Sequence, residues 1–502
     1  MTGDLLLGID LGTGGCKISV LNCSGGLEAS FSEDYATSHP QPGWAEQNPG
    51  DWYPALIACL KSLWADGRIH PARIAALAFD GSTHNAVLLD ASMRPLRPVI
   101  MWMDQRSAAE AADLDREYGS EIFRIGYQRP TATWTLSQLL WLKRHEPEVV
   151  GRVAQILFVK DYVRYLVTGV ACTDYIEAQG TLFFDMGSRH WSQELYALTG
   201  FPHSALPAIV KPMEIVGRVT DQAASDTGLC AGTPVVCGTS DSAIEAYAAG
   251  AINPGQCVAK LATAGNLNVI TAEATPHPQT LTYMHVVPGL WYTVTATNAA
   301  AACLRWFRNN FFEGKADRGT KQCESTYTRM GEEAARSPVG ARGLFFHPYL
   351  QGERSPYWDS ALRASFTGIG MFQGRGDFVR AVMEGVAFSL RDCRRTIEAM
   401  NLPIHEIRLI GGGAKDPLWA QIVCDVLETP IVLPMHSDAS SGAAMLAGVG
   451  IGLFSSERHA VDQCVRLKAK LLPRAAEAQT YSHLFAKYRK IHDVLAEVYH
   501  DA

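Results

Sequence analysis

Residues 8–17, GIDLGTGGCK, place an aspartate at the end of an apolar run and follow it with small and hydroxylated residues. A carboxylate there is costly to bury unless hydrogen-bond donors or a cation surround it, which makes Asp10 a candidate metal ligand. The glycines permit positive φ and close backbone approach, so N–H groups, the Thr13 hydroxyl and the Lys17 ammonium can surround phosphate oxygens. A plain glycine hairpin with a solvated aspartate explains the same residues, and this stretch alone favours the hairpin.

A second aspartate, Asp241, stands in VVCGTSDSAIEAYAAGA, residues 235–251, where an apolar strand is expected to pass into a helix of small residues. Aspartate at such a position commonly caps the helix. It can also act as a base at the mouth of a cleft. The position near the middle of the chain favours the base slightly, because ligands commonly bind between domains.

A third motif, IRLIGGGAKDPLWAQIVCDVL in residues 407–427, combines a strand, three consecutive glycines and a helix. Asp416 is a plausible N-cap and Pro417 suits the first helical turn. The motif is neither GxGxxG nor a Walker A loop, so it does not indicate generic dinucleotide or P-loop binding. Glycines there either make a tight strand-to-helix turn or let a flat ligand lie against the backbone.

Polar and aromatic side chains gather in the first half of the sequence, at His84 in GSTHNA and at Trp102, Asp104 and Arg106 in MWMDQR. Together they could line a polyhydroxylated ligand, with the ring covering an apolar sugar face, although any one of them is more often structural. In the second half, residues 353–354 of FHPYLQGERSPYWD are expected to form an ion pair between domains.

The elements that position these residues follow an α/β pattern in both halves of the chain. LGTGG at 11–15 and LATAG at 261–265 each lie between two strand-like runs, which predicts two similar hairpins half a chain apart. We therefore expect one domain over residues 1–250 and a second over residues 251–502. The periodicity predicts strands over 74–90 and 406–413, helices over 107–119, 377–400, 417–428 and 476–502, and an amphipathic helical region over 151–169.

Composition narrows the class of ligand and the compartment. The net charge is −7 without long basic runs, which argues against nucleic acid as a partner. The 12 cysteines show no CxxC or ladder spacing and are expected to be free thiols. The sequence starts on a strand-like run without a basic leader, and its longest apolar run is too short to cross a bilayer. A cytoplasmic protein that binds a small molecule and no membrane is expected.

Taken together, the chain resembles the FGGY carbohydrate kinases, and among them the xylulokinase-like members, over almost its full length. The motifs that carry the resemblance occur in family order: GIDLGTGGCK, PGWAEQNPGDWY, MWMDQR, LWLKRHEPEV, KDYVRYLVTG, EAQGTLFFD, CGTSDSAIEAYAAGA, PYLQGERSPYWD, FVRAVMEGVAFSL and GGGAKDPLWAQIVCDVLETPI. The resemblance implies two ribonuclease H-like domains of the actin and hexokinase type around a cleft. It also implies ATP on the second domain, a sugar in the first, Mg²⁺ as a cofactor, and a homodimer, which is frequent in the family.

The resemblance carries over site residues as well. It implies that Asp241 is the catalytic base, that Asp10 and Asp241 hold the metal, and that transfer is in-line. The implied sugar contacts are Thr83, His84, Trp102, Asp104 and Arg106. The implied phosphate and nucleotide contacts are Gly12, Thr13, Gly14, Lys17, Thr263, Gly412, Gly413 and Asp416.

Departures from the family pattern leave the sugar open. Ser82-Thr83-His84 replaces the usual Gln-Met-His, and Glu177 stands where a shorter Asp or Asn is usual. Ala262 and Ala264 replace the common Gly and Ser of the second phosphate loop. We expect a ketopentose such as D-xylulose, with ribulose, erythritol, another polyol or a signalling furanone as alternatives. Outside this class, a non-catalytic sugar sensor or an actin-like or chaperone ATPase is the rival hypothesis.

Overall fold

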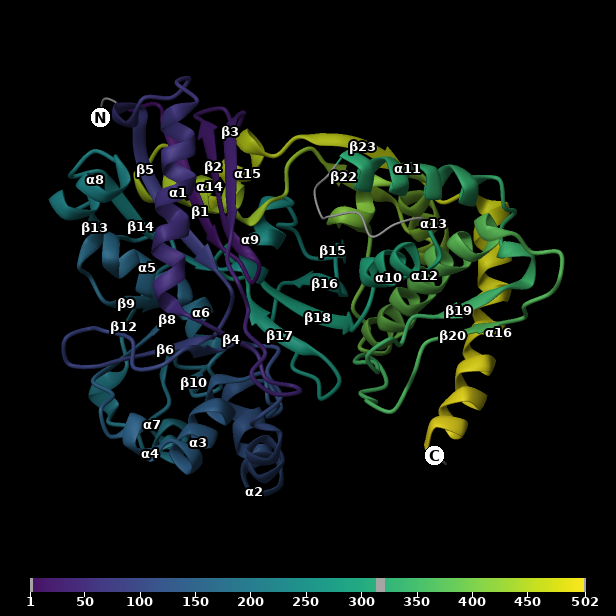
Figure 1. The fold of residues 1–502 in the computed structure, drawn as a ribbon, viewed down its shortest axis with the longest axis horizontal. Helices are drawn as coiled ribbons and strands as arrows, with labels where there is room; N and C mark the ends of the chain where they lie inside the picture. Colours follow the sequence, from purple (N-terminus) through teal and green to yellow (C-terminus); the bar gives the residue numbers. More distant parts are fainter. Residues whose placement is uncertain (1–2, 313–320, 501–502) are drawn as a thin grey trace.

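Each of the two lobes is built on one mixed β-sheet, as the computed structural model in Figure 1 shows; it describes residues 3–312 and 321–500. The first sheet has the strand order β13 (Ile215–Arg218), β14 (Pro234–Ser240), β5 (Ile74–Gly81), β1 (Leu5–Leu11), β2 (Gly15–Asn22) and β3 (Leu27–Asp34). The second has the order β17 (Leu281–Met284), β18 (Trp291–Thr297), β16 (Gly265–Thr271), β15 (Gln256–Leu261), β21 (Glu406–Ile410), β22 (Ile431–Pro434) and β23 (Leu467–Leu471).

The two sheets share one topology, which confirms the repeat predicted from LGTGG and LATAG. β1 and β2 form an antiparallel hairpin, and β15 and β16 form another. The first strand of each hairpin has a parallel partner on its other side, β5 or β21, followed by a second parallel strand, β14 or β22. Each sheet then ends in an antiparallel strand, β13 or β23. The α/β fold class is therefore confirmed.

Helices cover both sheets, and short two-stranded sheets extend the lobes. The helices are α1 (Trp52–Ala65), α2 (Ala108–Gly126), α3 (Thr135–His145), α4 (Pro147–Val150), α5 (Val159–Thr168), α6 (Tyr175–Gln179), α7 (Gln193–Thr199), α8 (Asp221–Thr227), α9 (Asp241–Ala248), α10 (Ala301–Phe311), α11 (Lys321–Ala335), α12 (Arg375–Ala399), α13 (Pro417–Leu427), α14 (Ala439–Gly450), α15 (Glu457–Cys464) and α16 (Ala475–His500). The short sheets pair β4 (Glu46–Gln47) with β7 (Val99–Ile100), β6 (Ala86–Leu89) with β8 (Gln155–Phe158), β9 (Cys172–Asp174) with β12 (Ala208–Val210), β10 (Phe184–Asp185) with β11 (His190–Trp191), and β19 (Phe345–His347) with β20 (Ser365–Thr367).

The alternation of side chains along β1 explains how the first sheet is covered. Leu5 and Leu7 belong to a core shared with α1 and α5, whereas Leu6 faces the core that contains α14. Gly8 points to the same face as Leu6, and a Cβ there would lie 1.7 Å from the Ser440 carbonyl oxygen. The glycine therefore lets α14 lie directly on the sheet.

Helix α14 and its neighbour α15 come from the 251–502 segment but pack on the first lobe. The hydroxyls of Ser19 on β2 and Ser440 on α14 lie 2.8 Å apart. The strands of the first sheet all precede residue 250 and those of the second sheet all follow it. We therefore retain the boundary at residue 250 for the sheets, with α14 and α15 as a return of the chain to the first lobe.

The predicted helical region over residues 151–169 is partly wrong. Its first part forms β8, which pairs antiparallel with β6, and only the second part forms a helix, α5. Cross-strand pairing of the apolar run QILF with AVLL outweighs the helical periodicity. The helices predicted over 107–119, 377–400 and 417–428 are confirmed as α2, α12 and α13, and α16 reaches His500, while residues 501–502 lie outside the described residues.

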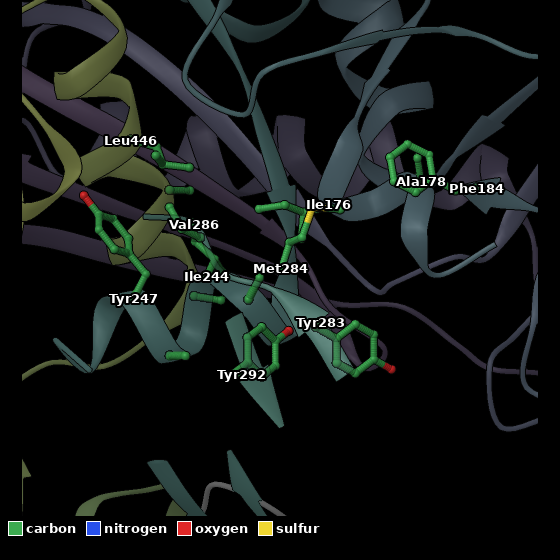
Figure 2. Close-up of a cluster of buried hydrophobic side chains, with 14 of the residues drawn as sticks. Ile176, Ala178, Phe184, Ile244, Tyr247, Tyr283, Met284, Val286, Tyr292 and Leu446 are labelled. Atoms are coloured by element: carbon green, nitrogen blue, oxygen red, sulfur yellow. The ribbon is translucent and has the colours of Figure 1, made fainter. Parts of the chain in front are cut away.

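Edge strand β17 of the second sheet rests on the first lobe. Figure 2 shows Met284 and Tyr283 of β17 in the apolar cluster that also holds Ile176 and Ile244 from the first lobe. The Met284 backbone N–H donates to Gln179 Oε1 at 2.9 Å. This contact helps to fix how the lobes meet.

The cysteines of the described residues agree with the expectation of free thiols. The cysteines in the described part of the chain are free thiols; the side chain of Cys323 lies outside it. Among the described helices, none combines the length and the apolar character needed to span a membrane.

Candidate active site

Hydrogen bonds join the predicted first-lobe residues into one connected set. The indole N–H of Trp102 donates to Thr13 Oγ1 at 3.1 Å, and the Thr13 and Ser82 hydroxyls lie 3.4 Å apart. The next residue, Thr83, donates its hydroxyl to Asp241 Oδ1 at 2.7 Å. Three stretches far apart in the sequence, around residues 13, 83 and 241, therefore meet at the carboxyl ends of β1, β5 and β14.

The backbone around Asp241 is shaped by a β-bulge in β14. Gly238 has φ +74°, and a Cβ there would lie 1.6 Å from the Phe79 carbonyl oxygen, so only glycine fits. Helix α9 begins at Asp241 itself, with Ser240 as its N-cap. The Asp241 carboxylate instead accepts from Thr83 and from the Ser242 backbone N–H at 2.7 Å, so the helix-cap interpretation is wrong.

The surroundings of Asp241 make its carboxylate more basic than usual. Burial raises its pKa, and the carboxylate of Glu245 raises it further. The Thr83 hydrogen bond and the Lys260 charge act in the opposite direction. A carboxylate with a raised pKa is better suited than an ordinary one to accept a proton from an alcohol.

Asp80 is a site residue that the sequence analysis missed. It ends β5 directly beside Asp10 at the end of β1, in parallel register. Burial, and then the Asp241 charge, raises the pKa of Asp10 to about 7, while burial and the Asp10 charge raise that of Asp80 well above its usual range. The signal was present, because Asp80, like Asp10, ends an apolar strand and is followed closely by glycine.

This carboxyl pair has the chemistry of a magnesium ligand set. Apart from the hydrogen bond that the two carboxyls can share, no donor in the described structure reaches Asp10 Oδ1 or either carboxyl oxygen of Asp80, although all three atoms are buried. No three His, Cys, Asp or Glu side chains of the described residues form a complete metal cage. Mg²⁺ commonly takes one or two carboxylates and completes its shell with substrate phosphates and water. Asp10 therefore fits the ion as a ligand of this kind.

The loop at residues 11–15, which is proposed to bind phosphate and is called the first phosphate loop, is held by its neighbours and not by unusual φ values. None of Gly12, Gly14 and Gly15 has positive φ, so the loop does not use the conformational freedom that glycine permits there. Gly15 is required for close approach, because a Cβ there would lie 2.6 Å from the Glu33 carbonyl oxygen. Tyr35 donates to the Gly12 carbonyl at 2.5 Å. The loop keeps open space beside Gly14, where no atom would lie within 4 Å of a Cβ.

Lys17 lies opposite Asp10 in the β1–β2 hairpin and forms an ion pair with Asp438 at 2.8 Å. The pair is partly exposed, with 33 % and 44 % of the two side chains accessible. Lys17 therefore reaches the start of α14 in this structure, and contact with phosphate requires it to leave Asp438.

The loop at residues 261–265, called the second phosphate loop, packs against the triple glycine at residues 411–413. The backbone N–H groups of Ala300 and Ala301 donate to the carbonyls of Thr263 and Ala262 at 2.9 and 2.7 Å. Gly411 has φ +92°, and a Cβ there would lie 2.6 Å from the Leu261 carbonyl oxygen just before this loop. The structure thus brings Thr263 and the Gly411–Gly413 turn together on the second lobe.

Asp416 caps α13, as predicted, by accepting from the Trp419 backbone N–H at 3.0 Å. Gly331 of α11 passes close to it, since a Cβ there would lie 2.5 Å from Asp416 Oδ2. Asp416, Gly412 and Gly413 therefore line the start of α13 beside α11.

Asp104 and Arg106 form a buried ion pair behind Trp102. Their side chains are fully buried 2.8 Å apart, and Arg106 also pairs with Glu46 at 2.7 Å. The guanidinium lies 3.6 Å from the Trp44 ring centre. Arg106 is thus occupied by protein groups, and it supports the turn that carries Trp102.

His84 is held in a strained backbone conformation, with φ +53°. Its N–H donates to Glu177 Oε1 at 2.5 Å, and its carbonyl accepts from the Thr135 hydroxyl at 2.7 Å. The ring packs on Trp134 with centroids 5.1 Å apart, and burial lowers the pKa of His84 to about 3. A neutral imidazole with Nδ1 buried and unpartnered in the described structure is available to hydrogen-bond a hydroxyl.

The lobes are joined beside the site by an ion pair that the sequence did not predict. Lys260 on β15 contacts Glu245 on α9 at 2.6 Å. The ion pair predicted at residues 353–354 is wrong: the Glu353 carboxylate accepts from the Thr297 hydroxyl at 2.6 Å and the Asn298 N–H at 2.8 Å within its own lobe.

Comparison with known proteins identifies the family. The N-terminal domain of the FGGY family of carbohydrate kinases matches residues 5–247, and the C-terminal domain of that family matches residues 260–451. The chain belongs to the FGGY family of carbohydrate kinases. This FGGY kinase is 33% identical to the xylulose kinase of Bacillus subtilis over 490 residues, which cover 97% of this chain and 96% of the relative.

Two solved structures resemble this FGGY kinase over nearly its whole length. The xylulose kinase from Rhodospirillum rubrum has a TM-score of 0.86 and 29% identity, with 99% of this chain and 100% of the other covered. The gluconate kinase from Lactobacillus acidophilus has a TM-score of 0.89 and 25% identity, with 99% of each chain covered. The fold is thus the two-domain actin- and hexokinase-like fold, and the protein is a carbohydrate kinase that uses ATP.

Proposed function

We propose that this FGGY kinase transfers the γ-phosphoryl group of ATP to a primary hydroxyl of a ketopentose, with D-xylulose as the first candidate. The xylulose kinases among its relatives support the substrate class. The observation that supports the mechanism is the Thr83–Asp241 hydrogen bond, which joins a proposed sugar contact directly to the proposed base.

In this mechanism the acceptor hydroxyl oxygen attacks the γ-phosphorus while the bond to the bridging oxygen of ADP breaks. Asp241 accepts the hydroxyl proton, and ADP leaves with the electron pair of the broken bond. The residues mainly position the reactants in line and balance charge, because phosphoryl transfer needs little covalent help from the protein.

Mg²⁺ would be held by Asp10 and Asp241, and when bound it supplies charge neutralisation to the phosphates. The unpartnered Asp10 oxygen and the adjoining Asp80 carboxyl support this assignment. Asp80 is placed to set the orientation and charge of Asp10.

We assign the nucleotide and the sugar to the two lobes. The proposed phosphate and nucleotide contacts are Gly12, Thr13, Gly14, Lys17, Thr263, Gly412, Gly413 and Asp416. The proposed sugar contacts are Thr83, His84, Trp102 and Asp104, whereas Arg106 acts through Asp104. Glu177 holds the backbone of His84, so its longer side chain affects which sugar the loop accepts.

Two further proposals concern assembly and compartment. Reduced thiols and the need for ATP favour the cytoplasm. We propose a homodimer because homodimers are frequent in the family. Analytical ultracentrifugation, which measures the mass of the particle in solution, tests this directly.

An ADP-release screen over D-xylulose, ribulose, erythritol, gluconate and furanones tests the function, with Asp241→Ala as the control. We expect sugar-stimulated ADP release that the substitution abolishes. Turnover without sugar would favour the ATPase alternative, and an unchanged rate in Asp241→Ala would refute the assigned base.

A further inference from the structure

Arg354 lies at the end of β18, beside the second phosphate loop. Its Nη2 donates to the Thr297 carbonyl at 3.3 Å, and the next residue, Ser355, donates its N–H to the Ala296 carbonyl at 2.9 Å. Thr297 pairs in register with Gly265, the first residue after the loop that holds Thr263. The guanidinium is therefore fixed to the strand end that frames this loop.

This guanidinium has no carboxylate partner in the described part of the chain. Its Nε is buried without a hydrogen bond, and its one side-chain contact is the Thr297 carbonyl. The neighbouring Glu353 carboxylate is already occupied by the Thr297 hydroxyl, by Asn298, and by the backbone N–H of Arg354. Desolvation lowers the pKa of Arg354 more than the Glu353 charge raises it, and the buried Nε has no hydrogen-bond partner in the described structure, so an anionic ligand would stabilise this guanidinium.

Two stacked tyrosines lie between Arg354 and the residues of the proposed sugar site. The Arg354 charge lowers the pKa of Tyr283, against the larger effect of burial, which raises it. Tyr283 stacks on Tyr292 with centroids 5.3 Å apart. Tyr292 in turn lies 3.2 Å, hydroxyl to hydroxyl, from Ser242, the residue after the proposed base. Tyr283 also packs near Trp134, which covers the ring of His84. In Figure 2 the two tyrosines extend from the β17–β18 hairpin at the lower edge of the apolar cluster.

We propose that Arg354 is a further substrate-contacting residue that binds the transferring phosphoryl group from the second lobe. This proposal rests on the kinase function proposed above. Arg354 joins the second phosphate loop on one side to the wall of the sugar site on the other. A guanidinium matches phosphoryl oxygens with two parallel hydrogen bonds and stays protonated throughout. It stabilises the phosphoryl group as it moves from ATP to the sugar, and it then contacts the phosphorylated product.

Binding without turnover tests this contact. Calorimetry with D-xylulose and with D-xylulose 5-phosphate, in the absence of nucleotide, compares the wild type with Arg354→Gln. We expect the affinity for the sugar phosphate to fall on the order of 10- to 100-fold, the effect of one charge-assisted contact, and the affinity for the sugar to stay within about twofold. Arg363→Gln is the matched control, because Arg363 is an exposed arginine of the same loop that contacts only backbone carbonyls.

Kinetics supply a second readout. In Arg354→Ala, added guanidinium ion should restore part of the lost kcat, whereas a purely structural loss is not restored by it. The proposal would be overturned if Arg354→Gln lost affinity for the sugar and for the sugar phosphate equally. It would also be overturned if the variant lost affinity for gluconate but not for D-xylulose 5-phosphate or D-xylulose, because Arg354 would then bind a sugar carboxylate. The wild-type screen tests the kinase function separately, and if another sugar turns over, that sugar and its phosphate replace the pair above.

Discussion

The hydrogen bond from Thr83 to Asp241 predicts how the activity depends on pH. At 2.7 Å the Thr83 hydroxyl stabilises the ionised carboxylate and opposes the rise in pKa that burial and Glu245 cause. Thr83→Val keeps the shape of the side chain and removes the donor. The pKa of Asp241 in the variant therefore rises, and the base is protonated over a wider range of acidic pH.

The size of the effect follows from the strength of a hydrogen bond to a charged group, about 1.5–3 kcal/mol. That energy corresponds to a shift of the acidic limb of the kcat/KM profile by about 1 to 2 pH units toward higher pH. At a pH below the limb, the variant loses roughly tenfold or more, and the loss shrinks as the pH rises above the limb. The assay is kcat/KM for the sugar at saturating ATP between about pH 5 and pH 9.

Thr135→Val is the matched control for this experiment. Thr135 donates its hydroxyl to the carbonyl of His84, the residue after Thr83, and not to Asp241. We expect Thr135→Val to change sugar binding without moving the acidic limb. An unmoved limb in Thr83→Val, or an equal shift in both variants, would refute the reasoning.

Three further predictions concern other contacts of the site. Lys260→Met should lower kcat/KM about fivefold, because it breaks the partly exposed ion pair with Glu245. The double exchange Lys260→Glu with Glu245→Lys should restore kcat/KM. No recovery in the double variant would show that Lys260 acts on phosphate instead. Asp416→Ala should cost about 1 kcal/mol of stability, because it removes the cap of α13, and it should raise the KM for ATP. Ser456→Ala is the control: it removes the cap of α15 and should cost a similar amount of stability without changing the KM for ATP. Arg106→Met should cost about 3–5 kcal/mol because the Asp104 charge is left buried without its cation, and Tm in thermal unfolding should fall by roughly 3–10 °C. The exposed Arg363→Met should leave Tm unchanged.

The sequence was most informative where local geometry alone decides the structure. Small residues between two apolar runs are enough to specify a hairpin, so both hairpins could be placed from LGTGG and LATAG. The cap at Asp416 was equally predictable, because a cap depends on residues three positions apart. Asp80 was missed because its importance comes from its neighbour across the sheet, Asp10, which lies 70 residues earlier.

The two lobes repeat one sheet but differ in what joins its parallel strands, and this difference agrees with the proposed division of sugar and nucleotide between them. In the second lobe β21 and β22 are connected directly by the triple glycine and α13. In the first lobe β5 and β14 are separated by residues 82–233, and this long insertion carries His84, Trp102 and Trp134 over the strand ends. A repeat in the sequence predicts the shared sheet, whereas the proposed sugar site in the insertion also depends on contacts with β17 of the other lobe, such as that of Gln179 with Met284. Specificity therefore depends on pairs of residues far apart in the chain, which no local pattern predicts, and these are the positions where changes of sugar preference should be sought.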